Sequence, residues 1–202
     1  MPKKSSRKWL REHFKDTYVK KAHEEGARSR AVYKLEQIQE RDKVLKPCMT
    51  VVDLGAAPGG WSEYALKIVG KKGRVIALDL LDIEPIPGVE FIQGDFADDK
   101  VYEKLLNTLD GTLVDVVISD IAPNLSGIDS VDQPRSMALA ELVLDFSLNN
   151  LNEKGAMLIK VFQGSGFDEY LKDVRKNFKK VVIRKPKASR DRSREVYILA
   201  TK

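Results

Sequence analysis

The sequence has a single cysteine, Cys48, among its 202 residues. One cysteine cannot close a disulfide within the chain, and it cannot build a cysteine-rich zinc site. We therefore predict no metal centre. A protein without disulfides is typical of a reducing compartment, so we expect this one to be cytoplasmic.

Long apolar runs are missing as well. No stretch approaches the ~20 residues that a membrane-spanning helix needs. The N-terminal sequence MPKKSSRKWL is basic, but no apolar segment follows it, so we expect neither a signal peptide nor membrane association. With 43% hydrophobic and 32% charged residues, the composition is that of an ordinary globular protein, and the length suits one domain. We expect a monomer.

Acidic residues are scarce at both ends of the chain. Residues 1–30 and 171–202 carry charge balances of +6 and +9, whereas residues 31–170 carry −10, which together give the net charge of +5. If the fold brings the two ends together, they form one positive face that suits phosphate backbones. The alternative is that the basic ends are only solubilising tails.

Strand-like and helix-like segments alternate along the chain. The apolar strands lack strict alternation, as expected when helices cover both faces of a parallel sheet. Pro134 suits the first turn of a helix, and Gly155 suits the position just beyond its end. The pattern predicts a doubly wound α/β domain, with its ligand at the carboxyl ends of the strands. Strands are predicted at 50–54, 74–79, 89–93, 113–120, 156–162, 180–184 and 195–200, and helices near 29–41, 60–69, 99–109, 134–151 and 167–177.

The glycine-rich turn GAAPGG, residues 55–60, lacks the features of the common phosphate-binding loops. Ala57 breaks the pattern G-x-G-x-x-G, and Trp61 stands where the loop G-x-x-x-x-G-K-[ST] needs its lysine. The turn therefore carries no cation of its own to receive a phosphate.

Acids stand at the ends of the neighbouring strands instead. Asp53 is in the first, Asp79 ends the second, and Asp95 follows the third. Asp79 comes 24 residues after Gly55, a spacing that suits a carboxylate binding ribose hydroxyls. S-adenosylmethionine has a ribose, an adenine, an ammonium and a sulfonium but no phosphate, so it matches this set of groups. The alternative is a purely structural turn with surface acids.

Four charged residues in other segments complete the candidate site. Asp120 ends the strand VVISD, Lys160 lies inside the apolar strand AMLIKVF, and Lys34 lies beside the apolar face of the helix SRAVYKLEQI. Glu195 opens the last strand, and it joins Asp120 at the same rim if that strand runs antiparallel to the rest. Each of the four is also compatible with a structural salt bridge.

Two lysines and two acids beside a methyl donor suggest transfer to an oxygen of low acidity. A ribose 2′-hydroxyl must lose its proton as the methyl group arrives. A lysine can take that proton only as the free amine, and a second ammonium and partial burial both disfavour the charged form of a lysine. Alignment of the methyl group and the oxygen would supply several kcal/mol more.

The motifs together resemble the FtsJ/RrmJ family of ribose 2′-O-methyltransferases. They are the glycine turn, SDIAPNLSG (119–127), IKVFQG (159–164) and RSREVYI (192–198), with Lys34 in the first helix, and the likeness runs from residue 7 to residue 201. The resemblance implies a Rossmann-like S-adenosylmethionine-dependent methyltransferase fold at 31–202, with a mostly parallel seven-stranded sheet. Residues 1–30 would be a basic segment that contacts RNA.

The resemblance also implies roles for particular residues and a substrate. The catalytic tetrad would be Lys34, Asp120, Lys160 and Glu195, with Lys160 as proton acceptor. The implied substrate is a uridine 2′-hydroxyl in the A loop of 23S ribosomal RNA, within the assembled large ribosomal subunit. The implied contacts to S-adenosylmethionine are Gly59, Trp61, Asp79, Asp95 and Asp120.

Three other functions remain open at this point. A nicotinamide-dependent dehydrogenase would share the turn and Asp79, but it would leave Lys34, Lys160 and Glu195 unexplained. A non-catalytic RNA-binding module would explain the basic ends but not the acid-rimmed turn. A 2′-O-methyltransferase acting on transfer RNA or an mRNA cap would use the same tetrad.

Overall fold

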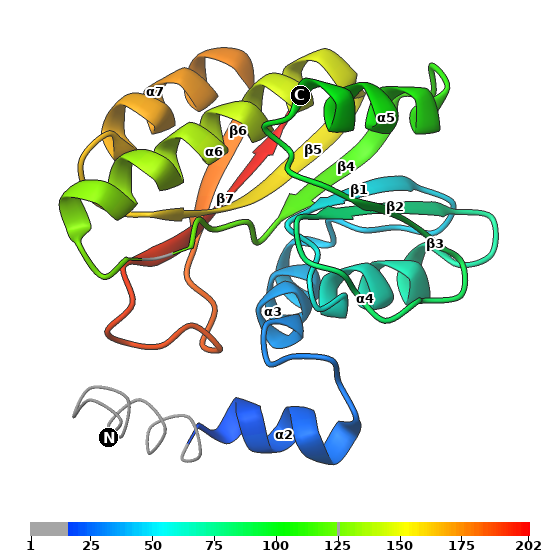
Figure 1. Cartoon of the computed structure of the whole chain (residues 1–202), viewed down its shortest axis with the longest axis horizontal. Coiled ribbons are helices and arrows are strands. Elements are labelled where there is room, and N and C mark those ends of the chain that lie inside the picture. Colours follow the sequence, from blue (N-terminus) through cyan, green and yellow to red (C-terminus); the bar gives the residue numbers. More distant parts are fainter. Residues whose placement is uncertain (1–15, 125) are drawn as a thin grey trace.

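A seven-stranded sheet with helices on both faces forms the body of the protein (Figure 1). The computed structural model describes residues 16–124 and 126–202, so most of the predicted basic N-terminal segment lies outside the described residues. No helix in these ranges combines the length and the apolar character needed to cross a bilayer. The strands are β1 (Thr50–Leu54), β2 (Arg74–Asp79), β3 (Val89–Gln93), β4 (Val114–Ser119), β5 (Leu151–Phe162), β6 (Lys180–Arg184) and β7 (Glu195–Thr201).

The strand order is β3-β2-β1-β4-β5-β7-β6. β1 pairs in parallel with both β2 and β4, so the order along the sheet reverses between β1 and β4. β7 alone runs antiparallel, between β5 and β6. The predicted doubly wound, mostly parallel fold is confirmed. In such a sheet the ligand crevice lies at the carboxyl ends of the strands, where the order reverses.

Helices form a layer on each side of the sheet. α3 (Val32–Asp42) and α4 (Gly60–Val69) cover one face, and the other is covered by α5 (Asp99–Leu109), α6 (Asp129–Asn150) and α7 (Phe167–Asn177) (Figure 1). The central strands are therefore buried on both sides, which is why their sequences are almost continuously apolar.

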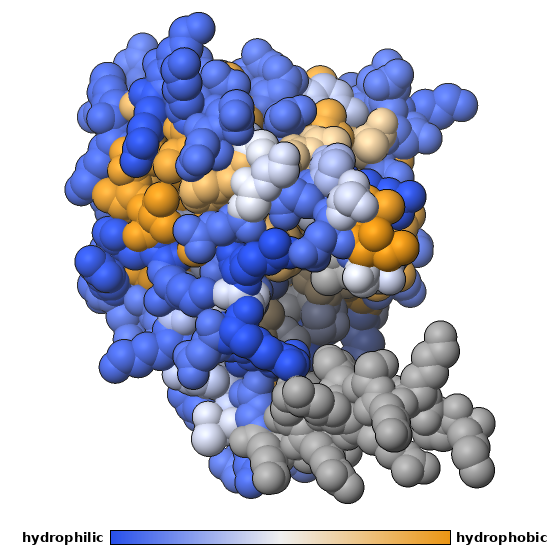
Figure 2. Space-filling view, turned by 90° about the vertical axis from the view of Figure 1, so that its left-hand side faces the viewer, coloured by the Kyte–Doolittle hydropathy of each residue, from blue (hydrophilic) through white to orange (hydrophobic). Residues whose placement is uncertain are grey.

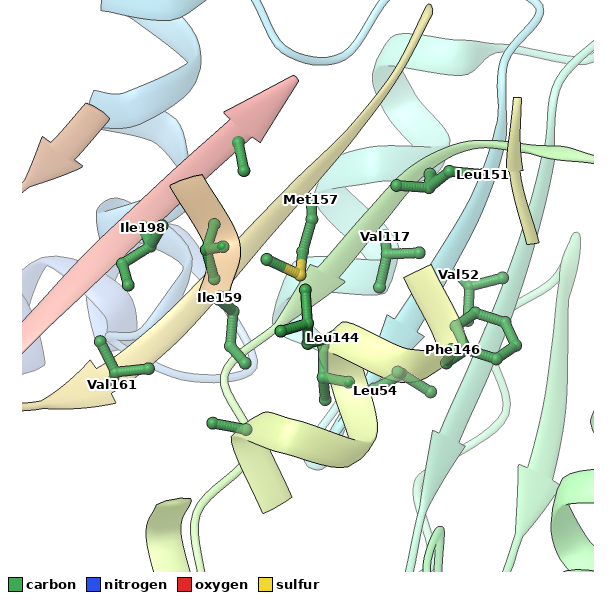
Figure 3. Close-up of a cluster of buried hydrophobic side chains, with 14 of the residues drawn as sticks. Val52, Leu54, Val117, Leu144, Phe146, Leu151, Met157, Ile159, Val161 and Ile198 are labelled. Atoms are coloured by element: carbon green, nitrogen blue, oxygen red, sulfur yellow. The ribbon is translucent and has the colours of Figure 1, made fainter. Parts of the chain in front are cut away.

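The larger core cluster lies between the sheet and α6 (Figure 3). Val52 and Leu54 of β1 point into it together with Leu144 and Phe146 of α6, and all four are nearly or fully buried. Their neighbour Val51 points to the opposite face and packs in the cluster beneath α3 and α4. Alternation along β1 therefore divides the core into two layers and fixes which side chains can reach each face.

The helix α6 begins earlier than the sequence predicts, at Asp129 instead of residue 134, so Pro134 lies inside the helix. Ile128, the residue before α6, makes no capping hydrogen bond through its side chain. The carboxylate of Asp132 instead accepts hydrogen bonds from the backbone N–H groups of Ser126 and Gly127, each at 2.8 Å. The capping acid lies inside the helix, and the N-cap position holds Ile128 in place of the usual Ser, Thr, Asp or Asn. The sequence therefore does not mark where the helix begins. Gly155, predicted just beyond the helix, lies within β5, which begins at Leu151.

The described part of the N-terminal segment, residues 16–30, meets the basic C-terminal segment. The sequence reading missed α2 (Thr17–Glu25), which begins after the capping side chain of Asp16 and ends at Gly26 in the left-handed conformation. Ala22 of α2 packs with Tyr33 and with Ala188 from the segment before β7. Arg30 ties the same parts, because it donates a 2.5 Å hydrogen bond to the carbonyl of Ala188 and pairs with Asp16 at 3.1 Å.

Candidate active site

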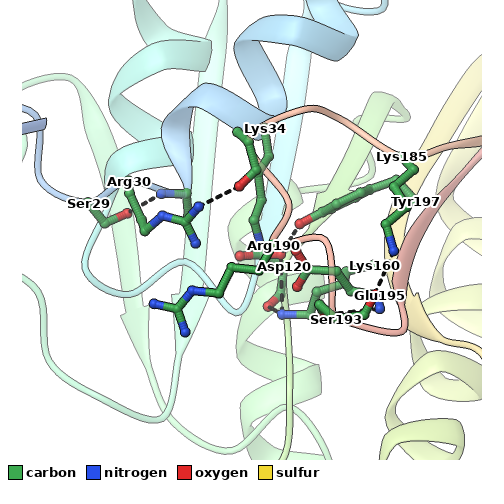
Figure 4. A network of polar contacts seen from close by, with 12 residues as sticks. Ser29, Arg30, Lys34, Asp120, Lys160, Lys185, Arg190, Ser193, Glu195 and Tyr197 are labelled. Carbon is green, nitrogen blue, oxygen red and sulfur yellow. Dashed lines mark hydrogen bonds and ion pairs between the residues drawn. The ribbon is translucent and has the colours of Figure 1, made fainter. Parts of the chain in front are cut away.

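The four residues predicted to form a tetrad lie together at the carboxyl edge of the sheet (Figure 4). Asp120 directly follows β4, and Lys160 lies near the end of the adjacent strand β5. Because β7 is antiparallel, its first residue Glu195 pairs with Phe162 at the end of β5. Lys34 reaches the same place from α3. The sheet topology thus joins residues that are far apart in the sequence.

Each lysine of the tetrad is paired with one of its acids. The Nζ atom of Lys34 lies 2.9 Å from Oε1 of Glu195. The Nζ atom of Lys160 lies 3.2 Å from Oδ1 of Asp120 and donates a 2.6 Å hydrogen bond to its backbone carbonyl. Both lysine side chains are only 8% exposed. Charges buried to this degree need partners, and the two pairs satisfy that requirement.

Tyr197 is a fifth member of the cluster that the sequence reading missed. Its hydroxyl donates a 2.7 Å hydrogen bond to Oδ1 of Asp120, and the Nζ atom of Lys34 lies 5.7 Å from the centre of its ring. The side chain is fully buried. A signal was present, because Tyr197 stands two residues after Glu195 in a strand and such residues share a face.

The electrostatics of the cluster keep Asp120 ionised and Tyr197 protonated. Burial by itself would raise the pKa of Asp120, but the charges of Lys160 and Lys34 and the hydrogen bond from Tyr197 lower it below its ordinary value. Burial is also the main reason why the pKa of Tyr197 is raised well above its ordinary value, and the charges of Asp120 and Glu195 add to this effect. Tyr197 is therefore a permanent hydrogen-bond donor to the carboxylate.

Removing the hydroxyl group of Tyr197 tests this arrangement. We expect Tyr197→Phe to lower the free energy of unfolding by about 1.5–3 kcal/mol at neutral pH, as for a hydrogen bond to a charged group. Because the bond lowers the pKa of Asp120, its contribution is full above the ordinary value of 3.8 and is lost as the pH falls through the lower folded-state value. Urea unfolding across a pH series measures both effects.

Tyr170→Phe is the matched control for that measurement. The hydroxyl group of Tyr170 is also buried, but it donates to an uncharged acceptor, the carbonyl of Ala140, at 3.1 Å. Its removal should cost about 0.5–1.5 kcal/mol without pH dependence across the acid range. If both variants lose the same free energy of unfolding, and neither loss depends on pH, the bond to Asp120 contributes no more than a bond to an uncharged acceptor.

A cavity of about 610 Å³ opens beside the tetrad, at the ends of β1, β2 and β4. This is the point where the strand order reverses. Its walls come from the glycine turn, from the segments after β2 and β3, from the segment after Asp120 and from α6. The residues that line it are Gly55, Ala57, Leu78, Asp79, Leu80, Leu81, Gly94, Asp95, Phe96, Ala97, Asp120, Ile121, Ala122, Pro123, Asn124, Arg135, Ala138, Leu139 and Leu142.

Backbone geometry shapes the floor of this cavity. Gly55 has a φ of 81°, and a Cβ atom there would lie 2.6 Å from the Cα atom of Ile121. Only glycine lets the turn approach the segment after Asp120 so closely. The carboxylate of Asp79 accepts 2.8 Å hydrogen bonds from the N–H groups of Ala57 and Leu81. These bonds fix its orientation, and each oxygen keeps a lone pair for a ligand.

The charged groups of the cavity fit S-adenosylmethionine. Asp79, Asp95 and Asp120 line it, against the single arginine Arg135. Carboxylates can accept from ribose hydroxyls and balance an ammonium or a sulfonium, whereas they would repel a diphosphate. Across the described ranges, no group of three or more His, Cys, Asp or Glu residues is arranged to hold a metal ion.

Two residues assigned to the cofactor lie outside the lining of the cavity. Gly59 is the N-cap residue before α4, and a Cβ atom there would lie 2.8 Å from Cδ1 of Ile86, so this glycine permits close packing of the loop before β3. The indole of Trp61 is buried and donates to the carbonyl of Ala31 at 2.8 Å. Their contact with a cofactor stays a prediction, and for Trp61 it would have to come from the backbone.

Asp53, the first acid of the predicted row, points away from the cavity. It is fully buried, and Oδ2 accepts a 2.6 Å hydrogen bond from the hydroxyl of Ser62. Burial raises its pKa to about 7 against the opposing effect of the Ser62 bond, and the charges of Asp120 and Asp79 raise it further. Asp53 therefore supports the first turn of α4 and is not one of the lining residues.

Arg28 is a second residue that the sequence reading missed. It donates to the carbonyl of Glu84 at 2.9 Å and to that of Pro58 at 3.4 Å. One guanidinium group thus joins the segment before α3, the glycine turn and the loop before β3. Nothing local marks such a role, because its hydrogen-bond partners are backbone carbonyls distant in sequence and its ion-pair partner, at 3.7 Å, is the equally distant Glu63.

Comparison with known proteins accounts for this arrangement. Residues 27–202 match the model of the FtsJ-like methyltransferase family. The chain belongs to that family. It is also 59% identical over 196 residues to the ribosomal RNA large subunit methyltransferase E of Stenotrophomonas maltophilia (strain K279a), a match that covers 97% of this chain and 93% of that protein. The predicted family and the predicted methyltransferase activity are both confirmed.

Solved structures agree with the family assignment. A ribosomal RNA methyltransferase from Plasmodium falciparum matches with a TM-score of 0.76 and 29% identity, over 86% of this chain and 97% of that one. Fibrillarin from Aeropyrum pernix, solved with natively bound S-adenosylmethionine, matches with a TM-score of 0.57 over 84% of this chain and 75% of that one. At 16% identity, the second likeness concerns the fold alone.

Proposed function

We propose that this FtsJ-like methyltransferase transfers a methyl group from S-adenosylmethionine to the ribose 2′-hydroxyl of a uridine in the A loop of 23S ribosomal RNA. The substrate would be the large ribosomal subunit, and the protein would act as a cytoplasmic monomer. The observation that carries the proposal is the buried Lys34, Asp120, Lys160 and Glu195 cluster beside an acid-lined cavity. The curated relative named for ribosomal RNA of the large subunit supports the choice of substrate.

The cavity would hold the cofactor through its acids. Asp79 would accept from the ribose hydroxyls, Asp95 would face the adenine end, and Asp120 would face the reactive end beside Lys160. Gly59 and Trp61 would contribute from the start of α4. When bound, S-adenosylmethionine supplies an electrophilic methyl group on a positively charged sulfur.

The tetrad would activate the 2′-hydroxyl group. Lys160, as the free amine, accepts the hydroxyl proton as the oxygen takes the methyl group. Asp120, held by Tyr197, orients the Lys160 amine through the contacts that already join them. Lys34 lies nearby as a second ammonium paired with Glu195, so its charge would stabilise a negative charge that develops on the oxygen.

The joined basic ends would bind the RNA. Figure 2 views the side on which β5 ends and β7 begins, and hydrophilic residues cover most of it. Residues 1–30 would act as an RNA-contacting segment and residues 31–202 as the methyltransferase domain. Lysines and arginines from both ends would supply cations for phosphate contacts; in residues 16–30 and 185–194 they are Lys20, Lys21, Arg28, Arg30, Lys185, Lys187, Arg190, Arg192 and Arg194.

Mapping of 2′-O-methyl groups in RNA from cells that lack the gene tests the proposal. We expect one uridine of 23S ribosomal RNA to lose its methyl group and to regain it when the gene is restored. A gene encoding Lys160→Arg is the control, and it should not restore the group. Loss of a methyl group from transfer RNA or from an mRNA cap, with ribosomal RNA unchanged, would replace this substrate with the alternative one.

A further inference from the structure

Six large hydrophobic side chains are exposed in the part of the chain that the structure describes. Three of them, Leu80, Leu81 and Leu142, line the cavity, where a cofactor would cover them. Ile183 belongs to the edge strand β6 and Leu113 precedes β4 at the amino edge of the sheet. Ile128 remains, 57% exposed and not among the lining residues. Ile128 belongs neither to a core cluster nor to the cavity lining, so neither explains a large apolar side chain at this position.

The backbone at Ile128 is fixed, although its side chain is exposed. Ile128 occupies the N-cap position of α6, where a short polar side chain is favoured. Its own N–H donates to the hydroxyl of Ser126 at 3.2 Å. Asp132 holds that same hydroxyl and the N–H groups of Ser126 and Gly127, each at 2.8 Å. An aliphatic group is thus presented to solvent from a hydrogen-bonded turn.

Two connections join the position of Ile128 to the tetrad. The segment that carries it starts directly after Asp120. The next residue, Asp129, pairs at 2.8 Å with Arg194, which precedes Glu195. The carbonyl of Arg194 accepts a 3.0 Å hydrogen bond from the N–H of Gln163, just beyond the end of β5. In Figure 1 the first turn of α6 accordingly lies at the same edge as the start of β7.

We propose that Ile128 packs against the base of a nucleotide that neighbours the methylated one. This inference rests on the proposed function. The 2′-hydroxyl has to reach Lys160, whose side chain is 8% exposed, so the target nucleotide must leave its stack. A base that has left its stack can pack against aromatic or apolar side chains instead. Arg194 of the basic 185–194 segment pairs with Asp129, the residue next to Ile128. Cations of that segment would bind phosphates, so RNA is the partner that this mixed surface fits.

A matched pair of variants in the full chain tests the inference. Leu113 is 56% exposed, almost the same as Ile128, but it lies at the opposite edge of the sheet. We expect Ile128→Ser to raise the KM for large subunits from cells lacking the gene by about tenfold, near the lower end of the range found for aromatic side chains stacked on bases. The kcat and the affinity for S-adenosylmethionine should stay near the parental values, and the thermal midpoint should not fall, because serine is a favoured N-cap residue. Leu113→Ser should change none of them, and Ile128→Leu should restore most of the KM.

A diazirine analogue of leucine placed at position 128 or 113 identifies the partner directly. We expect light-induced crosslinks to ribosomal RNA from position 128 and none from position 113. Crosslinks from position 128 to a ribosomal protein, or a KM for Ile128→Ser equal to that of Leu113→Ser, would overturn the inference while leaving the proposed function intact. If the unsubstituted protein does not methylate the subunits, the proposed function fails and the inference falls with it.

Discussion

Lys160→Arg is expected to lower the rate of methyl transfer by ~10²–10⁴-fold, the usual contribution of general-base catalysis. Arginine keeps the positive charge and can still pair with Asp120, but it does not lose its proton in the working pH range. If the amine must accept the hydroxyl proton, the rate falls while S-adenosylmethionine still binds. Single-turnover transfer to large subunits across a pH series, together with calorimetry of cofactor binding, measures both properties.

Two sets of variants control the experiment on Lys160. Lys154→Arg changes an exposed lysine of the same strand β5, at the end remote from the tetrad, and should keep parental activity. Lys34→Arg preserves a charge beside Glu195, so it should be milder than Lys34→Ala. Near-parental activity of Lys160→Arg would falsify the general-base role and leave Lys160 as an electrostatic or positioning group.

Asp79→Ala is expected to weaken S-adenosylmethionine binding by about 1.5–3 kcal/mol, which corresponds to roughly 10- to 150-fold in affinity. The substitution removes the carboxylate that would accept from the ribose hydroxyls. It also removes the hydrogen bonds from the N–H groups of Ala57 and Leu81, which set the shape of the cavity floor. Isothermal titration calorimetry with the purified protein measures the change.

Asp82→Ala is the matched control for Asp79→Ala. Asp82 is an exposed acid in the same loop, its carboxylate accepts only the N–H of Ile83 among the described contacts, and it does not line the cavity. Its loss should leave the affinity for the cofactor unchanged. An Asp79→Ala protein that binds as tightly as the parent would remove Asp79 from the cofactor site.

Several local features were predictable because they depend on neighbouring residues alone. The bounds of β1, β2, β3 and β6 agree with the sequence reading, since apolar runs bounded by turns determine short buried strands. The glycine turn was predicted from its composition, and Gly55 is indeed the residue whose Cβ would collide with Ile121. The helix α6 was harder, because Asp132 caps it from within and no cap residue precedes it.

The tetrad shows how far such reasoning extends. Asp120, Lys160 and Glu195 were marked by their positions at strand ends or inside an apolar strand. Their meeting depended on the assumption that β7 runs antiparallel, which the pairing of Glu195 with Phe162 confirms. Tyr197 was overlooked because a tyrosine in a strand is ordinary on its own. It becomes part of the site only when Asp120 comes within hydrogen-bonding distance.

The sequence by itself determined the alternation of strands and helices, a glycine turn without a phosphate-binding pattern, and the charged residues of the proposed tetrad. These depend on side-chain periodicity and residue type, which act over a few neighbouring residues. Tertiary structure alone decided that Asp53 bonds to Ser62 outside the cavity lining, that the indole N–H of Trp61 donates to the carbonyl of Ala31, and that residues 16–30 meet the C-terminal segment through Arg30 and Ala188. These depend on strand order and helix packing, because only the assembled core determines which distant residues come within contact distance.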